Sequence, residues 1–372
     1  MAVHRARSVL LPNGVADDAV VESQDGKITA VRPARAGDPP ARGGWLVPGL
    51  VNAHLHLELS WLAGRVAARA AGFGEWAGRL IEARRAGHAP DEDRLAAVTA
   101  ARAMAAGGTV AVGDVSNGGW TSGPLGDAGL SGVVFVEVLG LAQEVQGERM
   151  ARAAEPAHAE GSVVVRPAPH AVYSTPPALL VAACGARGGA PAAIHVGESP
   201  GEEAFLHGEG PIVAFVDGLG LDWRWWDLPR CSPIAWLDRL GVLGPDLLLV
   251  HGVHLSAADI ALVRTSGAPL CLCPRSNLHI GGQLPDVPAL LAAGIPLALG
   301  TDSLASCADL DVLGEVRTLH GAFPAVPIET WLRAATEGGA RALRFGVGEI
   351  AVGAAARMVW IDDDLDNREL CG

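Results

Sequence analysis

Eight short runs rich in β-branched residues recur along the middle of the chain, and a pattern typical of a helix follows most of them. Near-continuous apolar strands that alternate with helices indicate a parallel sheet covered on both faces. A count of eight favours closure into a (β/α)8 barrel over an open, doubly wound sheet. We therefore predict an α/β fold built around a TIM barrel. The runs cover residues 47–54, 108–115, 132–139, 162–170, 191–198, 247–252, 268–274 and 295–302.

The two ends of the chain do not follow this alternation. Residues 1–47 alternate and turn like antiparallel strands, and residues 345–372 contain another strand-like segment. We expect the ends to pair into a small composite β-sandwich domain beside a catalytic barrel spanning 48–344. Helices are expected between the barrel strands, at 91–106, 176–187, 232–242, 256–265, 286–293 and 308–321.

Charge and hydropathy narrow the classes of partner. The chain has 41 acidic against 28 basic residues and a formal net charge of −13, so it lacks the basic face that nucleic acid requires. It has no polybasic run for an anionic membrane and no apolar stretch long enough to span one. The N-terminus lacks a secretory pattern, and the six cysteines form no regular framework. We expect a cytoplasmic protein that acts on a small molecule.

Several of the apolar runs end in a residue that can bind a metal or move a proton. In a parallel barrel, reactive groups gather at the C-terminal ends of the strands. The first run ends in "PGLVNAHLHLELS", whose two histidines alternate along the strand so that both face inward. One histidine at a strand end is more often a hydrogen-bonded core residue, but this recurrence predicts one shared site. The residues are His54, His56, His170, His195 with Glu198 after it, His251 and Asp302.

These residue types suit one divalent metal ion with an open position. Imidazole nitrogen and carboxylate oxygen are ligands that zinc accepts, and iron or manganese also use them. Water bound to such an ion loses a proton near neutral pH and becomes a nucleophile. Glu198 would then carry protons, and His251 would hold the water or polarise the substrate. The expected ligands are His54, His56, His195 and Asp302, the last of which could also accept a proton.

The lysine content bears on the number of metal ions. Two-metal hydrolases of this barrel type commonly bridge their ions with a carboxylated lysine at a strand end. Lys27 is the only lysine and precedes the barrel, so this bridge is not available. We therefore predict a single ion.

Six motifs in the chain resemble, in order, those of the amidohydrolase superfamily in its cytosine-deaminase-like and chlorohydrolase-like branch. They are "PGLVNAHLHLELS", "PHAVYSTP", "HVGESPGEEAF", "LVHGVHLS", "CPRSNLHIGG" and "LGTDSLAS". The resemblance covers about the whole chain and implies a barrel with a composite β-sandwich, a mononuclear metal site and hydrolytic removal of an amino or halide group from a heterocycle. It implies the four ligands above, Glu198 and His251 as the catalytic pair, and His170 as a substrate contact.

The segment "LELS" after the paired histidines, the compact length and "GTDSLAS" are similar to 6-amino-6-deoxyfutalosine deaminases of an alternative menaquinone pathway. This implies deamination of an adenine-type nucleoside with release of ammonia. The same ion and water also serve deaminases of adenosine, S-adenosylhomocysteine, guanine or cytosine, triazine-type chlorohydrolases and imidazolonepropionase, so these alternatives stay open. An inactive binding protein is disfavoured, because every expected ligand and Glu198 are present.

The other candidate substrate contacts are Glu58, Arg275, Asn277, Ser303 and Trp225. Glu58 would bind ribose hydroxyls or support His56. Trp225 belongs to a Trp-rich insertion at 199–231, and long loops on the active face of a barrel usually form lids or binding loops. A tryptophan there would stack on a flat heterocycle, with Arg224 or Arg275 meeting an acidic group. The alternative is that the tryptophans pack the insertion onto the barrel or onto a second subunit, and a homodimer is the commonest closed assembly.

Overall fold

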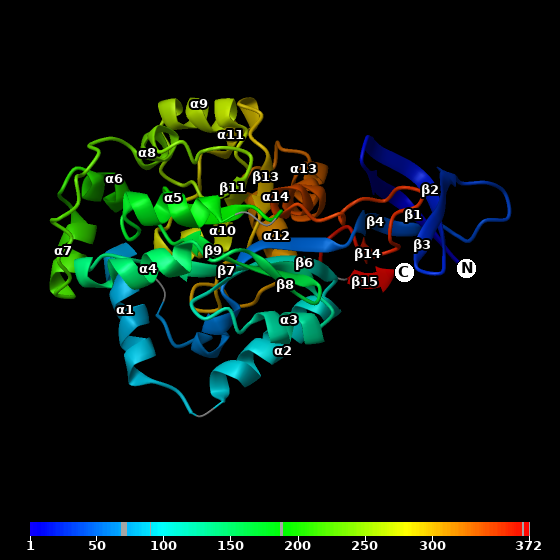
Figure 1. The fold of residues 1–372 in the computed structure, drawn as a ribbon. Helices are drawn as coiled ribbons and strands as arrows, with labels where there is room; N and C mark the ends of the chain where they lie inside the picture. Colours follow the sequence, from blue (N-terminus) through cyan, green and yellow to red (C-terminus); the bar gives the residue numbers. More distant parts are fainter. Residues whose placement is uncertain (68–72, 90, 187–188, 367, 372) are drawn as a thin grey trace.

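The computed structural model describes residues 1–67, 73–89, 91–186, 189–366 and 368–371 (Figure 1). Eight parallel strands lie in two sheets, ordered β5-β6-β7-β9 and β10-β11-β12-β13. The prediction of an α/β fold with parallel strands is confirmed, and each predicted run overlaps one of these strands. The strands are β5 (Leu50–Leu55), β6 (Thr109–Ser116), β7 (Ser131–Val138), β9 (Val163–Pro169), β10 (Ala192–Val196), β11 (Leu247–His251), β12 (Leu270–Leu272) and β13 (Leu297–Leu299).

Two isolated parallel bridges join the sheets to one another. One pairs Leu55 with Asp302 and the other pairs Ala171 with His195. A short strand, β8 (His158–Glu160), pairs antiparallel with β9 at the sheet edge, which the sequence did not predict. The bridges bring the ends of β5, β9, β10 and the segment after β13 close together, and closure of the sheets into a barrel stays a prediction.

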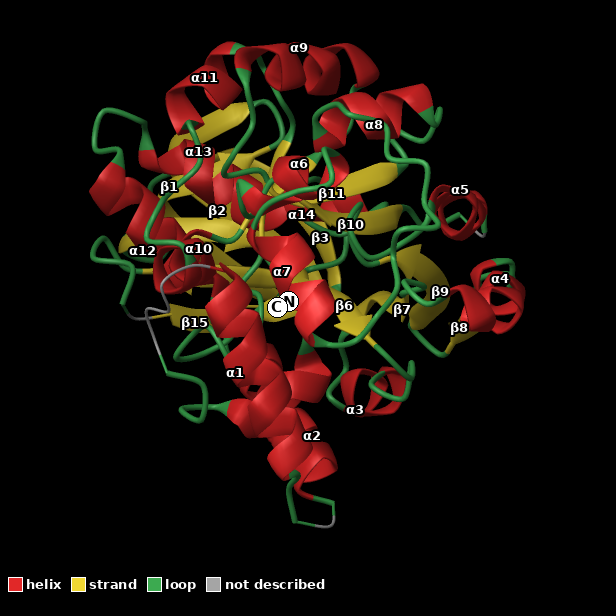
Figure 2. Ribbon diagram, turned by 90° about the vertical axis from the view of Figure 1, so that its left-hand side faces the viewer, coloured by secondary structure: helices red, strands yellow, loops and turns green. Residues whose placement is uncertain are grey.

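Helices surround the parallel strands (Figure 2). The predicted helical segments correspond to α2 (Glu92–Ala106), α5 (Pro177–Gly185), α8 (Pro233–Arg239), α9 (Ala257–Ser266), α11 (Val287–Ala292) and α12 (Val312–Ala322). Others were not predicted: α1 (Phe73–Ala86), α3 (Ser122–Asp127), α4 (Gln146–Ala153), α6 (Gly201–Leu206), α7 (Pro211–Gly218), α10 (Pro274–Ile280), α13 (Ile328–Arg333) and α14 (Gly339–Leu343). Short 3-10 turns, η1 (Leu57–Leu62) and η2 (Gln143–Val145), and a π-helical turn, η3 (Ala334–Gly338), complete the helical segments.

Burial explains why the runs form parallel strands. Every residue of β6, β10 and β11 is buried, so both strand faces pack against apolar neighbours. Val51, Phe135 and Val250 belong to one apolar cluster, while Ile194 and Leu249 belong to a second cluster with residues of the surrounding helices. The core therefore continues through the sheets and leaves the strand ends as the place where polar side chains gather.

The two termini share one six-stranded sheet, ordered β15-β14-β4-β1-β2-β3. Its C-terminal part joins the N-terminal part through antiparallel pairing of β14 with β4, in which Met358 lies opposite Pro48. Figure 1 shows this sheet at the opposite side of the molecule from α1 and α7. The strands are β1 (Ala2–Leu11), β2 (Gly14–Gln24), β3 (Lys27–Pro33), β4 (Arg42–Pro48), β14 (Met358–Ile361) and β15 (Arg368–Cys371).

Among the described residues, no helix has the length and apolar character needed to cross a membrane. The predicted homodimer and cytoplasmic location stay predictions.

Candidate active site

The residues that the sequence places at strand ends meet at one end of the parallel strands. Two imidazoles approach closely, with 3.2 Å between Nε2 of His56 and Nε2 of His195. Oδ1 of Asp302 lies 3.4 Å from Nε2 of His56 and 3.8 Å from Nε2 of His54. His251 joins the group, with its Nε2 3.7 Å from Oε1 of Glu198.

Each member of the group is held by a strand end. His54 lies inside β5 and His195 inside β10, whereas His251 is the last residue of β11. Asp302 follows β13. Its position is fixed because its backbone N–H donates to the carbonyl oxygen of His54 at 3.0 Å. The parallel arrangement therefore brings residues at or just after the ends of β5, β10, β11 and β13 into one cluster.

The cluster fits a metal ion. Both ring nitrogens of His54 are buried without a hydrogen-bond partner among the described residues, which is costly unless something else satisfies them. Nδ1 of His195 lies 2.9 Å from the carbonyl oxygen of His170, so it donates there and leaves Nε2 as a lone pair. Three imidazole nitrogens and one carboxylate oxygen form a donor set that suits zinc.

Burial keeps these imidazoles neutral, which is the form that can offer a lone pair. Burial, followed by the charges of neighbouring histidines, lowers the pKa of His54 and of His56 well below the ordinary value. Burial also lowers the pKa of His251 to about 3 and that of His170 to about 4. The histidines therefore act as acceptors or ligands near neutral pH.

The backbone is strained at two positions of the cluster. His251 has φ of +79° and Asp302 has φ of +61°, in the left-handed region that residues other than glycine rarely adopt. Such strain persists only where the surrounding structure enforces it, and it gathers at functional sites. The observation supports a functional role for both residues.

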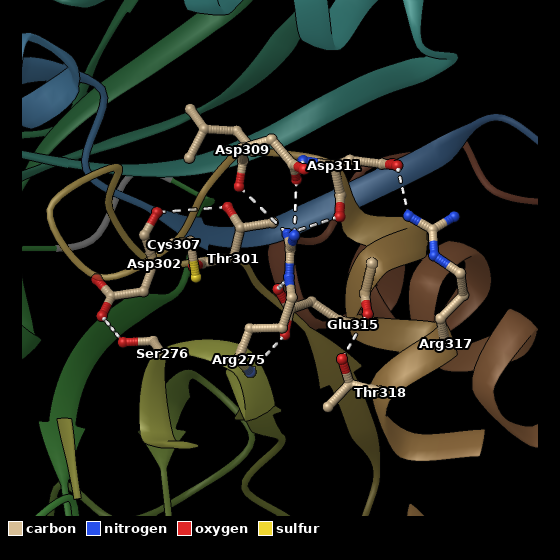
Figure 3. A network of polar contacts seen from close by, with 12 residues as sticks. Arg275, Ser276, Thr301, Asp302, Cys307, Asp309, Asp311, Glu315, Arg317 and Thr318 are labelled. Atoms are coloured by element: carbon tan, nitrogen blue, oxygen red, sulfur yellow. Dashed lines mark hydrogen bonds and ion pairs between the residues drawn. The ribbon is translucent and has the colours of Figure 1, made fainter. Parts of the chain in front are cut away.

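Helix α10 contacts Asp302 through Ser276, as Figure 3 shows, and it contacts His251 through Asn277. The hydroxyl of Ser276 donates to Oδ2 of Asp302 at 2.5 Å, and Ser306 donates to the same oxygen at 3.2 Å. Nδ2 of Asn277 lies 3.0 Å from Nδ1 of His251. One short helix thus orients two members of the cluster.

Substitution of Ser276 by alanine is expected to lower kcat/KM by about tenfold. This is the lower end of the roughly 10–100-fold range that is typical when a metal-binding side chain loses a supporting hydrogen bond. The reason is that Asp302 keeps only its longer bond to Ser306. Steady-state kinetics checks this, with Ser266→Ala as control, because the Ser266 hydroxyl bonds only to a backbone oxygen and a backbone N–H in α9 and the turn after it. Equal activity of the two variants would show that Ser276 does not position Asp302.

Glu198 is fixed by a second carboxylate. Glu202, in α6, accepts the backbone N–H groups of Gly197, Glu198 and Ser199 at 2.9, 2.7 and 3.2 Å. Burial raises the pKa of Glu198 well above its ordinary value, and the charges of Asp302 and Glu202 add to the effect. A buried carboxyl that readily holds a proton and is held in place by its backbone suits proton transfer.

A cavity of about 270 Å³ opens above the cluster. Its lining residues with an imidazole, carboxyl or hydroxyl group are His56, His170, Tyr173, Ser174, His195, Glu198, His251, Asp302 and Ser303. Its walls are apolar and come from α1, from α7 and the residues after it, and from the segment after β7. A largely apolar cavity with a few convergent polar groups is the usual form of a small-molecule site.

The predicted substrate contacts separate into two groups. His170 and Ser303 line the cavity, whereas Glu58, Arg275, Asn277 and Trp225 do not. Glu58 accepts the hydroxyl of Ser116 at 3.0 Å and the backbone N–H of Asn117 at 2.8 Å. Glu58 therefore holds neighbouring protein groups and does not face the cavity. Asn277 likewise contacts the protein, because its Nδ2 lies next to Nδ1 of His251.

Arg275 is held by acidic neighbours (Figure 3). Its Nε donates to Glu315 at 2.5 Å and its Nη1 to Asp309 at 2.7 Å. Arg224 is likewise paired with Asp217, with 2.8 Å between Nη2 and Oδ2. Neither guanidinium is free to meet an acidic group of a substrate without giving up these partners.

The tryptophans of the 199–231 insertion pack against protein. The indole N–H of Trp225 donates to the carbonyl oxygen of Leu141 at 2.9 Å, which links the insertion to the segment after β7. Trp223 donates to Asp217 at 3.0 Å, and Phe205 lies between Trp223 and Trp226 with ring centroids 5.2 and 5.9 Å away. These contacts favour the packing alternative over stacking on a heterocycle.

Substitution of Trp225 by phenylalanine is expected to lower the free energy of unfolding by about 1 kcal/mol, because it removes the indole N–H that is shared between the carbonyl oxygens of Leu141 and Asp222. Denaturant unfolding measures the loss. Trp226→Phe is the matched control, since the indole nitrogen of Trp226 is buried without a hydrogen-bond partner among the described residues. An equal loss in both variants would mean that the hydrogen bonds of the Trp225 indole add nothing.

Sequence reasoning missed two buried carboxylates next to the cluster. Oε1 of Glu137, in β7, lies 3.8 Å from Nδ1 of His195, and burial raises the pKa of Glu137 to about 7. Asp114, in β6, accepts the backbone N–H of Leu57 at 2.7 Å and so holds the chain just after His56. Each is the one charged residue in its apolar run, a signal that could have found it.

The sequence and fold match known proteins. The amidohydrolase family model matches residues 45–370. A 5-methylthioadenosine/S-adenosylhomocysteine deaminase of Halobacterium salinarum is 31% identical over 371 residues, covering 93% of this chain and 80% of the relative. An aminodeoxyfutalosine deaminase of Deinococcus radiodurans is 31% identical over 326 residues, covering 80% and 73%. The crystal structure of an adenosine deaminase from Xanthomonas campestris with bound zinc has a TM-score of 0.74 at 29% identity, covering 97% of this chain and 84% of that one.

Proposed function

Because the chain belongs to the amidohydrolase family, we propose that it removes the amino group of an adenine-type nucleoside by hydrolysis and releases ammonia. It is a hydrolase that acts on C–N bonds other than peptide bonds. The single observation that carries the proposal is the convergence of three histidines, Asp302 and the Glu198–His251 pair beneath one cavity. The names of the Halobacterium and Deinococcus relatives support an adenine nucleoside as the substrate.

The proposal includes one divalent ion held by His54, His56, His195 and Asp302. The preferred ion is zinc, with iron or manganese as alternatives that the same donors accept. When bound, the ion acts as a Lewis acid and lowers the pKa of water, so that the water can react as a nucleophile near neutral pH. The unpartnered nitrogens of His54 support this assignment.

The chain's own residues would guide the protons. His251 and Asp302 orient the attacking water, because both face the cavity and the Nε2 of His251 lies 3.7 Å from Oε1 of Glu198. Glu198 takes a proton from this water and passes it to the heterocycle and then to the departing amine. The C–O bond forms first, and the C–N bond then breaks as the adduct collapses; one proton of the water leaves on ammonia and the other stays on the deaminated heterocycle. His170 and Ser303 contact the substrate from the cavity wall.

The favoured substrate is 6-amino-6-deoxyfutalosine, an intermediate of menaquinone biosynthesis. The local sequence after the paired histidines and the Deinococcus relative support this choice. Methylthioadenosine and S-adenosylhomocysteine are the next candidates, because the Halobacterium relative is named for both.

The proposal also covers the domain organisation. Residues 48–344 would form a closed (β/α)8 barrel, for which the two bridges between the parallel sheets are the support. Residues 1–47 and 345–372 would form the small composite β-sandwich, for which the shared sheet of β4 and β14 is the support.

Ammonia release by the zinc-loaded protein tests the function. The panel contains 6-amino-6-deoxyfutalosine, adenosine, methylthioadenosine, S-adenosylhomocysteine, guanine and cytosine. Rapid release from an adenine nucleoside is the expected result. Release from guanine or cytosine alone, or from none of the six with the metal bound, would overturn the proposal.

A further inference from the structure

Helix α10 carries two residues that support the cluster, but its own sequence anchors it weakly. Ser276 donates to Asp302, and Nδ2 of Asn277 lies next to Nδ1 of His251. The helix has seven residues, and helices this short need tertiary contacts to be stable in water. The side chain of its N-cap residue, Cys273, accepts no hydrogen bond from the described residues of the first turn. Contacts from outside the helix must therefore fix its position.

Glu315, in α12, anchors the first turn of α10. Its Oε2 accepts the backbone N–H of Arg275 at 2.9 Å, which satisfies one of the N–H groups that a helix start leaves without a partner. Its Oε1 accepts Nε of the same arginine at 2.5 Å. The Glu315 side chain is fully buried and that of Arg275 is 19% exposed, so water competes little for this ion pair. One carboxylate thus fixes both the start of the helix and the direction of the Arg275 side chain.

The guanidinium of Arg275 holds the loop that connects Asp302 to α12 (Figure 3). Nη1 donates to Oδ1 of Asp309 at 2.7 Å, and Nη2 donates to the carbonyl oxygens of Asp309 and Asp311 at 3.2 and 2.9 Å. At the start of the same loop, Ser276 donates to Oδ2 of Asp302. Consecutive residues of α10 therefore hold both ends of the loop, and Asp302 is the residue from which the loop begins.

A glycine makes room for this guanidinium. A Cβ atom on Gly314, in α12, would lie 2.5 Å from Cζ of Arg275, too close for both atoms to remain where they are. The guanidinium thus occupies a place from which any side chain at position 314 would displace it. Arg275 itself is not one of the residues that line the cavity. Any influence of Arg275 on the site must therefore pass through α10 and the loop.

We propose that Arg275 is a positioning residue for the reaction, which holds α10 against the loop after Asp302 and so sets the spacing between Asp302 and His251. Asp302 belongs to the proposed ligand set, and His251 orients the attacking water. A displacement of about 1 Å at such groups can lower a rate by about 100-fold. The inference rests on the proposed function for its effect on turnover, whereas its effect on metal binding requires only the cluster.

The variant Arg275→Met tests this role, because methionine fills much of the same space and has no donor. With the nucleoside of the panel that the wild-type protein deaminates fastest, kcat is expected to fall about 10–100-fold while KM changes less than about threefold. The zinc dissociation constant, measured by competition with a chelator, should rise about tenfold, since Asp302 loses its fixed position. A rise of KM with kcat unchanged would make Arg275 a substrate contact and overturn the proposal.

Arg317→Gln is the matched control. Arg317, in α12, also contacts Asp311, with 3.4 Å between Nη2 and Oδ2, and its Nη1 donates to the carbonyl oxygen of Leu365. The variant removes a cation from the same network and leaves the bonds of Arg275 in place. It should keep kcat and zinc affinity within about twofold of the wild-type values, because a partly exposed ion pair contributes little. Equal losses in Arg317→Gln and Arg275→Met would point to the network as a whole and overturn the specific role of Arg275.

A second variant covers the case in which Arg275→Met does not fold. That variant leaves Glu315 as a buried charge without its partner, whereas Arg275→Met/Glu315→Leu removes both charges, a change that buried pairs often tolerate. Circular dichroism and denaturant unfolding verify the fold of the double variant. It should still show the lower kcat and the weaker zinc binding. Wild-type values of both quantities in either folded variant would overturn the proposal.

The outcomes also separate the two proposals. If the wild-type protein with zinc bound deaminates none of the panel, the proposed function fails, and the zinc dissociation constants still test the position of Asp302. Weaker zinc binding in Arg275→Met would then support the positioning role, and unchanged zinc binding would overturn it.

Discussion

Replacement of Glu198 by glutamine is expected to lower kcat by about 10²–10⁴-fold while the metal content stays unchanged. Glutamine keeps the size of the side chain but cannot exchange a proton. Glu198 lies outside the proposed ligand set, so the ion should remain bound. Its position also should not move, because Glu202 holds the backbone of residues 197–199 through three N–H groups.

The measurement combines steady-state kinetics with metal analysis of the same preparation. Glu203→Gln is the control, because Glu203 is one residue from Glu202 but exposed. It should retain wild-type turnover and metal content. Retained turnover in Glu198→Gln would remove Glu198 from the proton path, and loss of the metal there would make it a ligand instead.

Replacement of His195 by alanine is expected to weaken metal binding by more than about 100-fold, beyond the 10–100-fold cost of changing a residue that only supports a ligand. Nε2 of His195 faces Nε2 of His56 at 3.2 Å, and its other nitrogen is committed to the carbonyl of His170. Alanine removes a central donor, and the remaining groups cannot move into its place because strand ends hold them.

Metal content per chain after dialysis at controlled free zinc checks this prediction. His158→Ala is the control, because His158 lies in β8 and is exposed. Circular dichroism on both variants verifies the fold, so that metal loss is not confused with unfolding. Normal zinc content in a folded His195→Ala protein would exclude His195 from the ligand set.

The strands and the chemistry of their ends could be read from the sequence because both are local patterns. Residues 247–250 are uniformly apolar since β11 is buried on both faces, and His251 follows them as the last residue of that strand. The helices were predicted less completely: α1, with 14 residues, was missed together with several short helices, although α8 and α11 are equally short and were predicted. α6, α7 and α10 have eight residues or fewer, too few for an amphipathic period to stand out.

Supporting contacts could not be read, because they join segments far apart in the chain. Ser276 and Asp302 are 26 residues apart, and Asp114 and Leu57 are 57 apart. The local sequence around a serine or an aspartate does not indicate which distant residue will become its hydrogen-bond partner in the folded protein. Glu58 and Arg275 illustrate the converse, since side chains suited to bind a substrate are held by Ser116 and Glu315 instead.

By itself, the sequence determined the kind of fold and the identity of the clustered histidines and carboxylates, because hydrophobic periodicity and strand ends are written in consecutive residues. Only the tertiary structure decided which of the candidate contacts reach the cavity and that α1 brings Leu80 and Ile81 to it. The physical reason is that a cavity is formed by packing. Its walls come from α1, α7 and the strand ends together, and no one segment contains the information on where the others will lie.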